Sequence, residues 1–399
     1  MTTNNTNHAT QPQVSLDHIR DELSAIDSQL LELYKQREEL SLAVWDAKKE
    51  MDKAIYDPKQ EEVKLSRTLK EEPEDKKGRL RSFYRTLFRL SRGAQYEAAY
   101  NDQVNWPLGS DLIQARHREL TFNTLACQGT VGSYSSQAAQ HLYPDANLIN
   151  ITSFEGATNQ VMDGNVDAAV LPIENSTAGT VDDVFRLINS KKLYVVDAID
   201  LNIRHHLVAV PGTKLSQITR VMSHSQALSQ CSAVLKSMGW VTETISNTAF
   251  AAREVARLGK HNVAAIASEK AAEAYGLEVL MSEISNYYVN QTRFAVVSRL
   301  PVVRPTATHV SLQFSLSHQS GSLSHTLAVF ADLGLNMTKL QSRPIANRPW
   351  EYRFSLEFAG TPDDPRVERA LLQLSSELPD FRFTGWYEEH HPQDAKSSV

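Results

Sequence analysis

Positively charged side chains interrupt an apolar stripe in the first fifty residues. Apolar residues recur there at spacings of three and four, and this heptad-like pattern predicts one long helix. The stripe reaches Arg37 four residues after Leu33, and Lys48 lies four residues after Val44. A buried cation without a partner costs roughly 3–5 kcal/mol. One such side chain can extend to solvent, but two of them, with Arg20 beside the stripe, favour a cavity for a small polyanion.

Two further predicted helices carry polar side chains that suit the same cavity. Asp57-Pro58 has the pattern of an N-cap followed by proline in the first helical position, and Glu61 lies one turn later. In a third helix, predicted over 79–100, Ser91 and Gln95 fall on an apolar stripe. This set contains no nucleophile–base pair and no metal cluster. It suits a reaction accelerated by positioning and electrostatics, such as a pericyclic rearrangement of a dicarboxylate.

These stretches resemble the helical chorismate mutases that are fused to prephenate dehydratase. The resemblance implies that Arg37 binds a substrate carboxylate and that Arg20 reaches across from the partner subunit of an entwined dimer. It makes Lys48 and Gln95 the residues that bond the ether oxygen as the C–O bond breaks. The implied chorismate-binding set is Arg20, Arg37, Lys48, Asp57, Glu61, Ser91 and Gln95.

One position departs from that family. The family commonly has arginine immediately before the glutamate, whereas this chain has Gln60. Gln60 can form a capping box with Asp57, and the missing arginine is then only supportive. Alternatively, the lost cation weakens or abolishes mutase activity, and the helical domain serves as a dimeriser.

A row of arginines runs along one face of the third predicted helix. Its members are Arg81, Arg85, Arg89 and Arg92. Such a row can be a nucleic-acid face, but no stacking aromatics are interleaved with it. We therefore favour a solvated helix face and expect no nucleic-acid partner.

Short apolar strands alternate with helical segments over residues 121–299, which indicates an α/β domain with a mostly parallel sheet. Polar residues gather where predicted strands end. Gly129 and Gly132 precede a helix, where backbone N–H groups suit an anion. The clusters at 172–180, 223–226 with Gln230, and 290–294 fall at the edge where open sheets bind ligands. The neighbours His205 and His206 would point in opposite directions on a strand, so we interpret them as structural.

Together these motifs resemble the prephenate dehydratase domain. The resemblance implies two α/β subdomains, with prephenate in the cleft between them and phenylpyruvate as product, and neither cofactor nor metal. Thr292 is the family's essential residue; we expect it to hydrogen-bond the leaving hydroxyl or relay a proton to it. Arg293 would anchor a carboxylate or hold the loop, and Glu174, if buried, would donate a proton. Further candidates for the cleft are Asn175, Ser176, Ser223 and Gln230.

The last part of the chain predicts the order βαββαβ, which is that of a ferredoxin-like module. Two of its motifs resemble the phenylalanine-binding motifs of the regulatory ACT domain, although Gln341 stands where glutamate is common. The implied L-phenylalanine site comprises Gly321, Ser322, Leu323, Gln341, Ser342, Arg343 and Pro344, with Asn336 as a further pocket residue. The alternative is a dimerisation module without a ligand.

Length and composition agree with this organisation. The chain has 399 residues, of which 41% are hydrophobic and 22% charged, with a net charge of −6. Two cysteines exclude a disulfide scaffold and indicate a reducing, cytoplasmic compartment; no apolar run approaches the ~20 residues that span a bilayer, so we expect no membrane partner. The expected parts are a disordered tail (1–14), the helical domain (15–105), a linker (106–120), the α/β domain (121–299), a second linker (300–306), the ferredoxin-like module (307–388) and a tail (389–399).

We therefore expect a bifunctional enzyme of phenylalanine biosynthesis. It would act on chorismate and prephenate, respond to L-phenylalanine, and form a homodimer or higher homo-oligomer. Two alternatives remain. One is a monofunctional dehydratase with a degenerate mutase domain; the other is a catalytically silent amino-acid sensor, which the intact Thr292-Arg293-Phe294 beside Glu174 argues against.

Overall fold

The computed structural model describes residues 15–119, 121–316, 320–345 and 348–391. The chain forms two compact units. The first contains the N-terminal helices up to residue 105 together with 321–329 and 369–377, and the second contains the rest. The expected tail at 1–14 lies outside the described residues, as do positions 392–399. Within the described part of the chain, no helix is long and apolar enough to cross a membrane.

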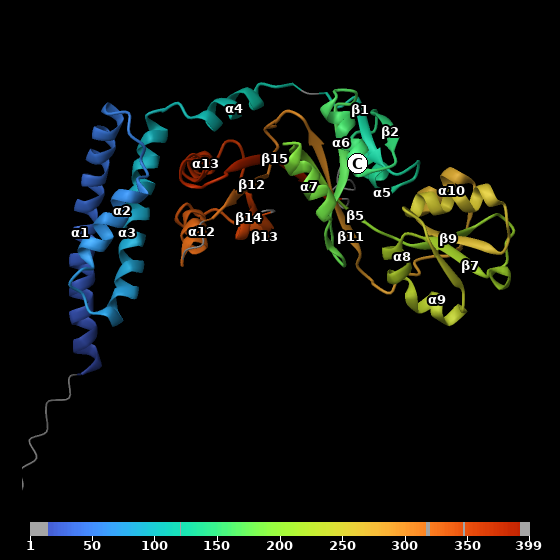
Figure 1. Ribbon diagram of the computed structural model, residues 1–399, viewed down its shortest axis with the longest axis horizontal. Helices are drawn as coiled ribbons and strands as arrows, with labels where there is room; N and C mark the ends of the chain where they lie inside the picture. Colours follow the sequence, from blue (N-terminus) through green and yellow to red (C-terminus); the bar gives the residue numbers. More distant parts are fainter. Residues whose placement is uncertain (1–14, 120, 317–319, 346–347, 392–399) are drawn as a thin grey trace, which may run out of the picture. The chain divides into compact units, whose positions relative to one another are not determined.

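Three helices build the N-terminal part of the first unit (Figure 1): α1 (Leu16–Glu50), α2 (Pro58–Thr68) and α3 (Glu74–Asn101). The predicted long first helix is confirmed, with Ser15 as its N-cap. The predicted start of α2 is also confirmed, because the Asp57 side chain accepts hydrogen bonds from the backbone N–H groups of Lys59 and Gln60. Leu65, Leu69 and Phe88 form a small core between α2 and α3.

The apolar stripe of α1 is largely exposed within one chain. Leu30 is 48% and Leu40 is 68% exposed. Only Ser41 and Trp45 of this helix are buried. The other exposed members of the stripe are Ile19, Leu23, Ile26, Leu33 and Val44. A row of large apolar side chains left in water marks an interaction surface.

The segment expected to be a linker after α3 contains a helix, α4 (Pro107–Arg116). Pro107 occupies its first turn, where a missing N–H is not needed. Leu112 and Ala115 are buried, which explains why this polar stretch is ordered.

The second unit is built on two sheets. In the described residues the first sheet joins the C-terminal strands β12 (His309–Ser315), β13 (Met337–Ile345), β14 (Arg348–Ala359) and β15 (Arg382–His390) to earlier strands. The strand order is β13-β14-β12-β15-β5-β11-β3-β1-β2, with β4 paired to β3. Its N-terminal strands are β1 (Thr124–Gln128), β2 (Asn147–Ile151), β3 (Ala168–Asn175), β4 (Gly179–Thr180), β5 (Tyr194–Asn202) and β11 (Gln291–Ser298). Its accompanying helices are α5 (Tyr134–Leu142), α6 (Phe154–Met162) and α7 (Asp182–Ser190).

The second sheet has the order β10-β6-β9-β7-β8. Its strands are β6 (His206–Ala209), β7 (Arg220–Ser223), β8 (Val241–Thr244), β9 (Val263–Ala267) and β10 (Glu278–Met281). Its helices are α8 (Ser225–Gln230), α9 (Ser232–Met238), α10 (Thr248–Leu258), α11 (Glu269–Tyr275) and a short 3-10 turn at Leu215–Gln217. In Figure 1 these elements form a lobe apart from β1, β2 and α5.

Both sheets are mixed, so the expectation of a mostly parallel sheet is wrong. β1 pairs in parallel with β2 and β3, but β11 is antiparallel to both β3 and β5. In the second sheet β6 is antiparallel to β9 and β10, whereas β7 is parallel to β8 and β9. The physical reason is the chain path: β11 re-enters the first sheet after the excursion through the second, and its direction is set by that return.

The C-terminal segment follows the predicted order of elements: β12 (His309–Ser315), α12 (Ser322–Asp332), β13 (Met337–Ile345), β14 (Arg348–Ala359), α13 (Pro365–Glu377) and β15 (Arg382–His390). Its strands lie in the order β13-β14-β12-β15. β15 also pairs in parallel with β5, which joins this segment to the first sheet. The strand extends to His390, beyond the end expected at 388.

Candidate functional sites

A cavity of about 370 Å³ lies among α1, α2 and α3. Every predicted chorismate-binding residue except Arg20 lines it. Arg20 is exposed on α1 and pairs with Asp17 at 3.2 Å. The lining residues are Arg37, Leu40, Ser41, Val44, Lys48, Ile55, Asp57, Gln60, Glu61, Lys64, Phe88, Ser91, Arg92 and Gln95.

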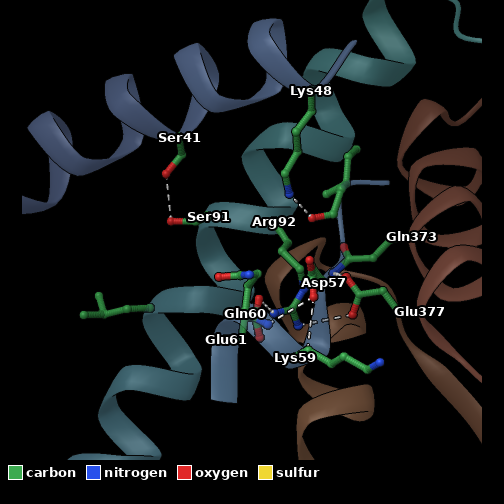
Figure 2. A network of polar contacts seen from close by, with 12 residues as sticks. Ser41, Lys48, Asp57, Lys59, Gln60, Glu61, Ser91, Arg92, Gln373 and Glu377 are labelled. Atoms are coloured by element: carbon green, nitrogen blue, oxygen red, sulfur yellow. Dashed lines mark hydrogen bonds and ion pairs between the residues drawn. The ribbon is translucent and has the colours of Figure 1, made fainter. Parts of the chain in front are cut away.

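The two cations of the α1 stripe turn into this cavity. Arg37 donates to the backbone oxygen of Leu87 at 2.9 Å and to the Ser91 hydroxyl. Lys48 donates to the backbone oxygen of Ile55 (Figure 2). Burial lowers the pKa of both Arg37 and Lys48, and for Lys48 the carboxylates of Asp57 and Glu61 oppose that shift. The cations are therefore held by neutral carbonyl groups and remain available to an anion.

Arg92 lies in this cavity, although the sequence predicted a solvated helix face for it. Arg92 is only 11% exposed and bonds to Glu61 and to Glu377 of α13. Arg89 is also buried. The expectation of a solvated arginine row on α3 is therefore wrong at these two positions, because the helix face that carries them packs inward.

Two uncharged residues complete the cavity. Gln95 is buried, and its side-chain oxygen has no hydrogen-bond partner among the described residues. Ser41, which the sequence did not single out, donates to the backbone oxygen of Arg37 and contacts the Ser91 hydroxyl at 2.9 Å (Figure 2). It lies one turn after Arg37, and this spacing is the signal by which it was identifiable.

A second cavity, of about 390 Å³, lies in the second unit. It is lined by strands and helices of the first sheet and, from the second subdomain, by α8, the start of α10 and the residues next to them. Its lining residues are Gln128, Ser133, Tyr134, Ser135, Phe154, Pro172, Asn175, Val181, Asp183, Ile203, His205, His224, Gln226, Ala227, Gln230, Ser246, Asn247, Thr248, Thr292 and Phe294. Three residues predicted for the cleft therefore line this cavity: Thr292, Asn175 and Gln230.

Asn175 organises this cavity. Its side-chain nitrogen donates to the Thr292 hydroxyl at 2.9 Å and to Asn290 at 2.8 Å. Its side-chain oxygen accepts from Thr177 and from Gln226. Because Thr292 accepts this bond, its own hydroxyl hydrogen is free to donate to a group in the cavity.

His205, the residue immediately before β6, extends the network. Its Nε2 atom lies 2.8 Å from the Gln230 side-chain oxygen, and Gln230 donates to Thr177. Burial lowers the pKa of His205, so the ring is neutral at pH 7. Nε2 then carries the hydrogen, and the buried Nδ1 is an acceptor without a partner among the described residues. His205 was predicted to be structural, and it lies in the wall of the cavity.

Strand alternation places several predicted residues outside this cavity. Glu174 precedes Asn175 on β3 and faces the other way; its side chain is 32% exposed and pairs with Lys339. The premise that Glu174 is buried is wrong. β3 also continues through Pro172 to Asn175 rather than ending at the proline. The pairing of β3 with β11 shifts its register next to Pro172, which accommodates the proline in the strand.

Arg293 likewise points away from Thr292. It bonds to Asp200 at 3.0 Å and pairs with Glu389 and Glu357. Asp200, Glu389 and His391 have side-chain oxygen or nitrogen atoms within 4.8 Å of one another, a spacing at which they could bind a metal ion. Arg293, however, already pairs with Asp200 and Glu389. The guanidinium holds the sheet together and does not line the cavity.

Two hydroxyl candidates also bond elsewhere. The Ser176 hydroxyl accepts from the backbone N–H of Gln291. Ser223 is fully buried and donates to the backbone oxygen of Ile266 at 2.7 Å. Neither lines the cavity.

The predicted glycine loop brings the two subdomains close together. Gly132 has a φ of +80°, and a Cβ there would lie 2.6 Å from the Cα of Ala271. Ser133 caps α5 and Asn247 caps α10. Both helix N-termini line the cavity, and among the described residues its lining contains no lysine or arginine.

The second predicted regulatory motif lies on β13 and faces the segment between β3 and α7. Gln341 donates to the Thr180 hydroxyl at 2.8 Å, and Arg343 pairs with Asp182 at 2.8 Å. Leu340, Ser342 and Pro344 alternate with them on the opposite, exposed face. Gly321 has a φ of +88°, immediately before Ser322 and Leu323 begin α12 in the first unit.

Comparisons with known proteins identify both the helical and the α/β parts of the chain. The family model "Chorismate mutase type II" matches residues 19–96, and "Prephenate dehydratase" matches 125–301. An Arabidopsis thaliana arogenate dehydratase/prephenate dehydratase is 36% identical over 66% of this chain and 72% of its own length. A bifunctional chorismate mutase/prephenate dehydratase from Enterobacter agglomerans is 31% identical over 94% of this chain and 96% of its own length.

Two solved structures are also similar. A quorum-quenching acylase, GqqA, has a TM-score of 0.62 at 30% identity, covering 68% of this chain and 99% of that one. The prephenate dehydratase from Arthrobacter aurescens in complex with L-Phe has a TM-score of 0.61 at 31% identity, covering 66% and 90%.

One chain thus combines two enzyme domains, a helical chorismate mutase and an α/β prephenate dehydratase. It belongs to the family of bifunctional chorismate mutase/prephenate dehydratases.

Proposed function

We propose that the helical cavity rearranges chorismate to prephenate and that the cavity in the α/β domain converts prephenate to phenylpyruvate. The observation that carries this assignment is the placement of six of the seven predicted chorismate residues around one cavity and of Thr292 in the other. The purified chain, supplied with prephenate, should release phenylpyruvate. A chain that leaves prephenate intact would contradict the dehydratase assignment.

In the helical cavity the chain's task is to hold a folded dicarboxylate and to stabilise charge on the ether oxygen. Arg37, beside Ser91, binds a carboxylate. Lys48 and the Gln95 amide hydrogen-bond the ether oxygen as the C–O bond breaks and the C–C bond forms. Asp57 and Glu61 orient the ring hydroxyl. No proton needs to be transferred, so preorganised charge supplies the acceleration.

The exposed stripe of α1 is assigned to a second copy of this chain. Its length and regular spacing match a helix–helix interface, and dimerisation would place Arg20 of the partner at the open side of the helical cavity. Leu30→Glu introduces a charge into that stripe and should convert a dimer to a monomer in sedimentation equilibrium. A wild-type chain that sediments as a monomer at micromolar concentration would refute this assignment.

In the dehydratase cavity two bonds of prephenate must break. The bond to the ring carboxylate breaks and releases carbon dioxide; its electron pair moves into the ring, and the bond to the ring hydroxyl breaks. Thr292 donates its hydrogen to the departing hydroxide, which leaves as water, and solvent restores the proton. Because the described residues of the lining include no arginine or lysine, the N-termini of α5 and α10 hold the carboxylates.

The C-terminal segment is assigned as an ACT domain that binds L-phenylalanine and inhibits the dehydratase. The strand order β13-β14-β12-β15 supports a ferredoxin-like module. The contacts of β13 with Thr180 and Asp182 give it a route to the segment that follows Asn175. L-phenylalanine should give a heat of binding in calorimetry at millimolar concentration; no heat would favour a module without a ligand.

A further inference from the structure

Arg92 connects two carboxylates that come from distant parts of the chain. Its Nη1 donates to Glu61 on α2, while Nε and Nη2 donate to the two oxygens of Glu377 at 2.8 and 3.2 Å. The guanidinium carbon lies 4.6 Å from the centre of the Tyr56 ring. Figure 2 shows Arg92 between Glu61 and Glu377. Ring stacking and three charge-assisted bonds fix the guanidinium in one orientation.

Glu61 depends on this arginine for its charge partner. Its side chain is 29% exposed and belongs to the helical cavity. The residue before it, Gln60, is neutral. Arg37 and Lys48 bond to backbone carbonyl groups. Arg92 is therefore the cation that hydrogen-bonds the Glu61 carboxylate in the described structure.

We propose that Arg92 is a positioning residue of the mutase cavity, which supplies the positive charge that Gln60 does not and holds Glu61 for the substrate. The inference rests on the proposed function of that cavity. Glu377 positions Arg92 in turn: it is the last residue of α13, and Gln373 one turn earlier donates to it at 3.1 Å.

The charges around Glu61 make this role visible in a pH profile. The groups that face Glu61 are Arg92 on α3, Lys48 and Arg37 on α1, Tyr56 just before α2, and Glu377 on α13. Burial raises the pKa of Glu61. The positive charges of Arg92 and Lys48 oppose that shift, whereas the negative charge of Glu377 adds to it. Removing the Arg92 charge therefore raises the pKa further, so that Glu61 becomes protonated at higher pH.

The test measures kcat/KM for chorismate across pH with the full-length chain. Arg92→Gln should lower the mutase value by about 30-fold or more and move the acid limb of the profile to higher pH. Glu377→Gln should lower it by a smaller factor, because Arg92 keeps its bond to Glu61. Gln60→Arg in the Arg92→Gln background should recover part of the loss. Arg81→Gln, an exposed change on the same helix, is the matched control.

The outcomes separate this inference from the assignment of the cavity. The helical content of each variant, measured by far-UV circular dichroism, together with its urea unfolding, reports whether the first unit, which contains Arg92 and Glu377, is folded. If Arg92→Gln is folded and keeps both the rate and the acid limb, the inference is overturned while the mutase cavity stands. If Arg92→Gln does not fold, Glu377→Gln decides: an unchanged mutase rate and profile overturns the inference. A wild-type chain that cannot convert chorismate overturns the cavity assignment itself.

Discussion

Replacing Thr292 by valine separates the catalytic from the structural role of its hydroxyl. The two side chains have nearly the same shape, so the variant removes one oxygen from a position that is 8% exposed. Asn175 loses one acceptor but keeps Asn290 at 2.8 Å and the backbone oxygen of Gln291 at 3.0 Å. The free energy of unfolding should therefore fall by only about 1 kcal/mol.

The catalytic loss should be larger. A preorganised donor to a developing oxyanion contributes about 100- to 1000-fold to kcat, equivalent to ~3–4 kcal/mol. Phenylpyruvate formation from prephenate measures this directly, and urea unfolding measures stability. Thr292→Ser, which keeps the O–H group, should stay within about tenfold of the wild type.

Ser298→Ala is the matched control for this experiment. Ser298 lies on the same strand, is 1% exposed, and donates to the backbone oxygen of Leu300. The variant should lose comparable stability and retain dehydratase activity. A Thr292→Val enzyme within about threefold of the wild-type kcat would refute the assignment of the hydroxyl to the leaving group.

Three further predictions address the rest of the second unit. Glu174→Gln should leave kcat for prephenate within about threefold of the wild type, since its side chain faces Lys339 rather than the cavity; a loss of ~100-fold would return it to the mechanism. Gly132→Ala should destabilise the chain by more than Gly164→Ala in urea unfolding: both have positive φ, but only Gly132 has backbone within 3 Å of the added Cβ, and equal losses would contradict the close approach. Because the pKa of His205 is lowered in the folded chain, its contribution to the free energy of unfolding is fully present above the pKa of about 6.5 in the unfolded chain and falls as pH drops below that. His205→Gln should reduce this fall in the free energy of unfolding between about pH 7 and 5. An unchanged pH dependence would exclude His205 as its source.

Local patterns in the sequence were sufficient for much of the fold. The heptad-like spacing predicts α1, and Asp57-Pro58 predicts the start of α2, because both signals depend on residues within one or two turns. Apolar runs that alternate with helical segments likewise predicted the α/β part of the chain over residues 121–299. The mixed direction of the sheets was not predictable in the same way, since it depends on the return of β11 after the second sheet.

The dehydratase cavity shows the same difference between features that depend on neighbouring residues and features that depend on long-range contacts. Alternation along a strand predicts that Thr292 and Arg293 face opposite sides, but not which side faces the cavity. The long-range partners decide: Arg293 meets Asp200 and Glu389 on one side, and Thr292 meets Asn175 on the other. Arg92 was misplaced for the same reason, because its partner Glu377 is 285 positions away in the sequence.

The most direct test of the account is to supply chorismate alone to the purified chain and to follow both its disappearance and the appearance of phenylpyruvate. Two working cavities in one chain predict that chorismate is consumed and phenylpyruvate accumulates. If chorismate persists while added prephenate is still converted, the helical cavity is not a working mutase, and the helical domain serves only to associate chains.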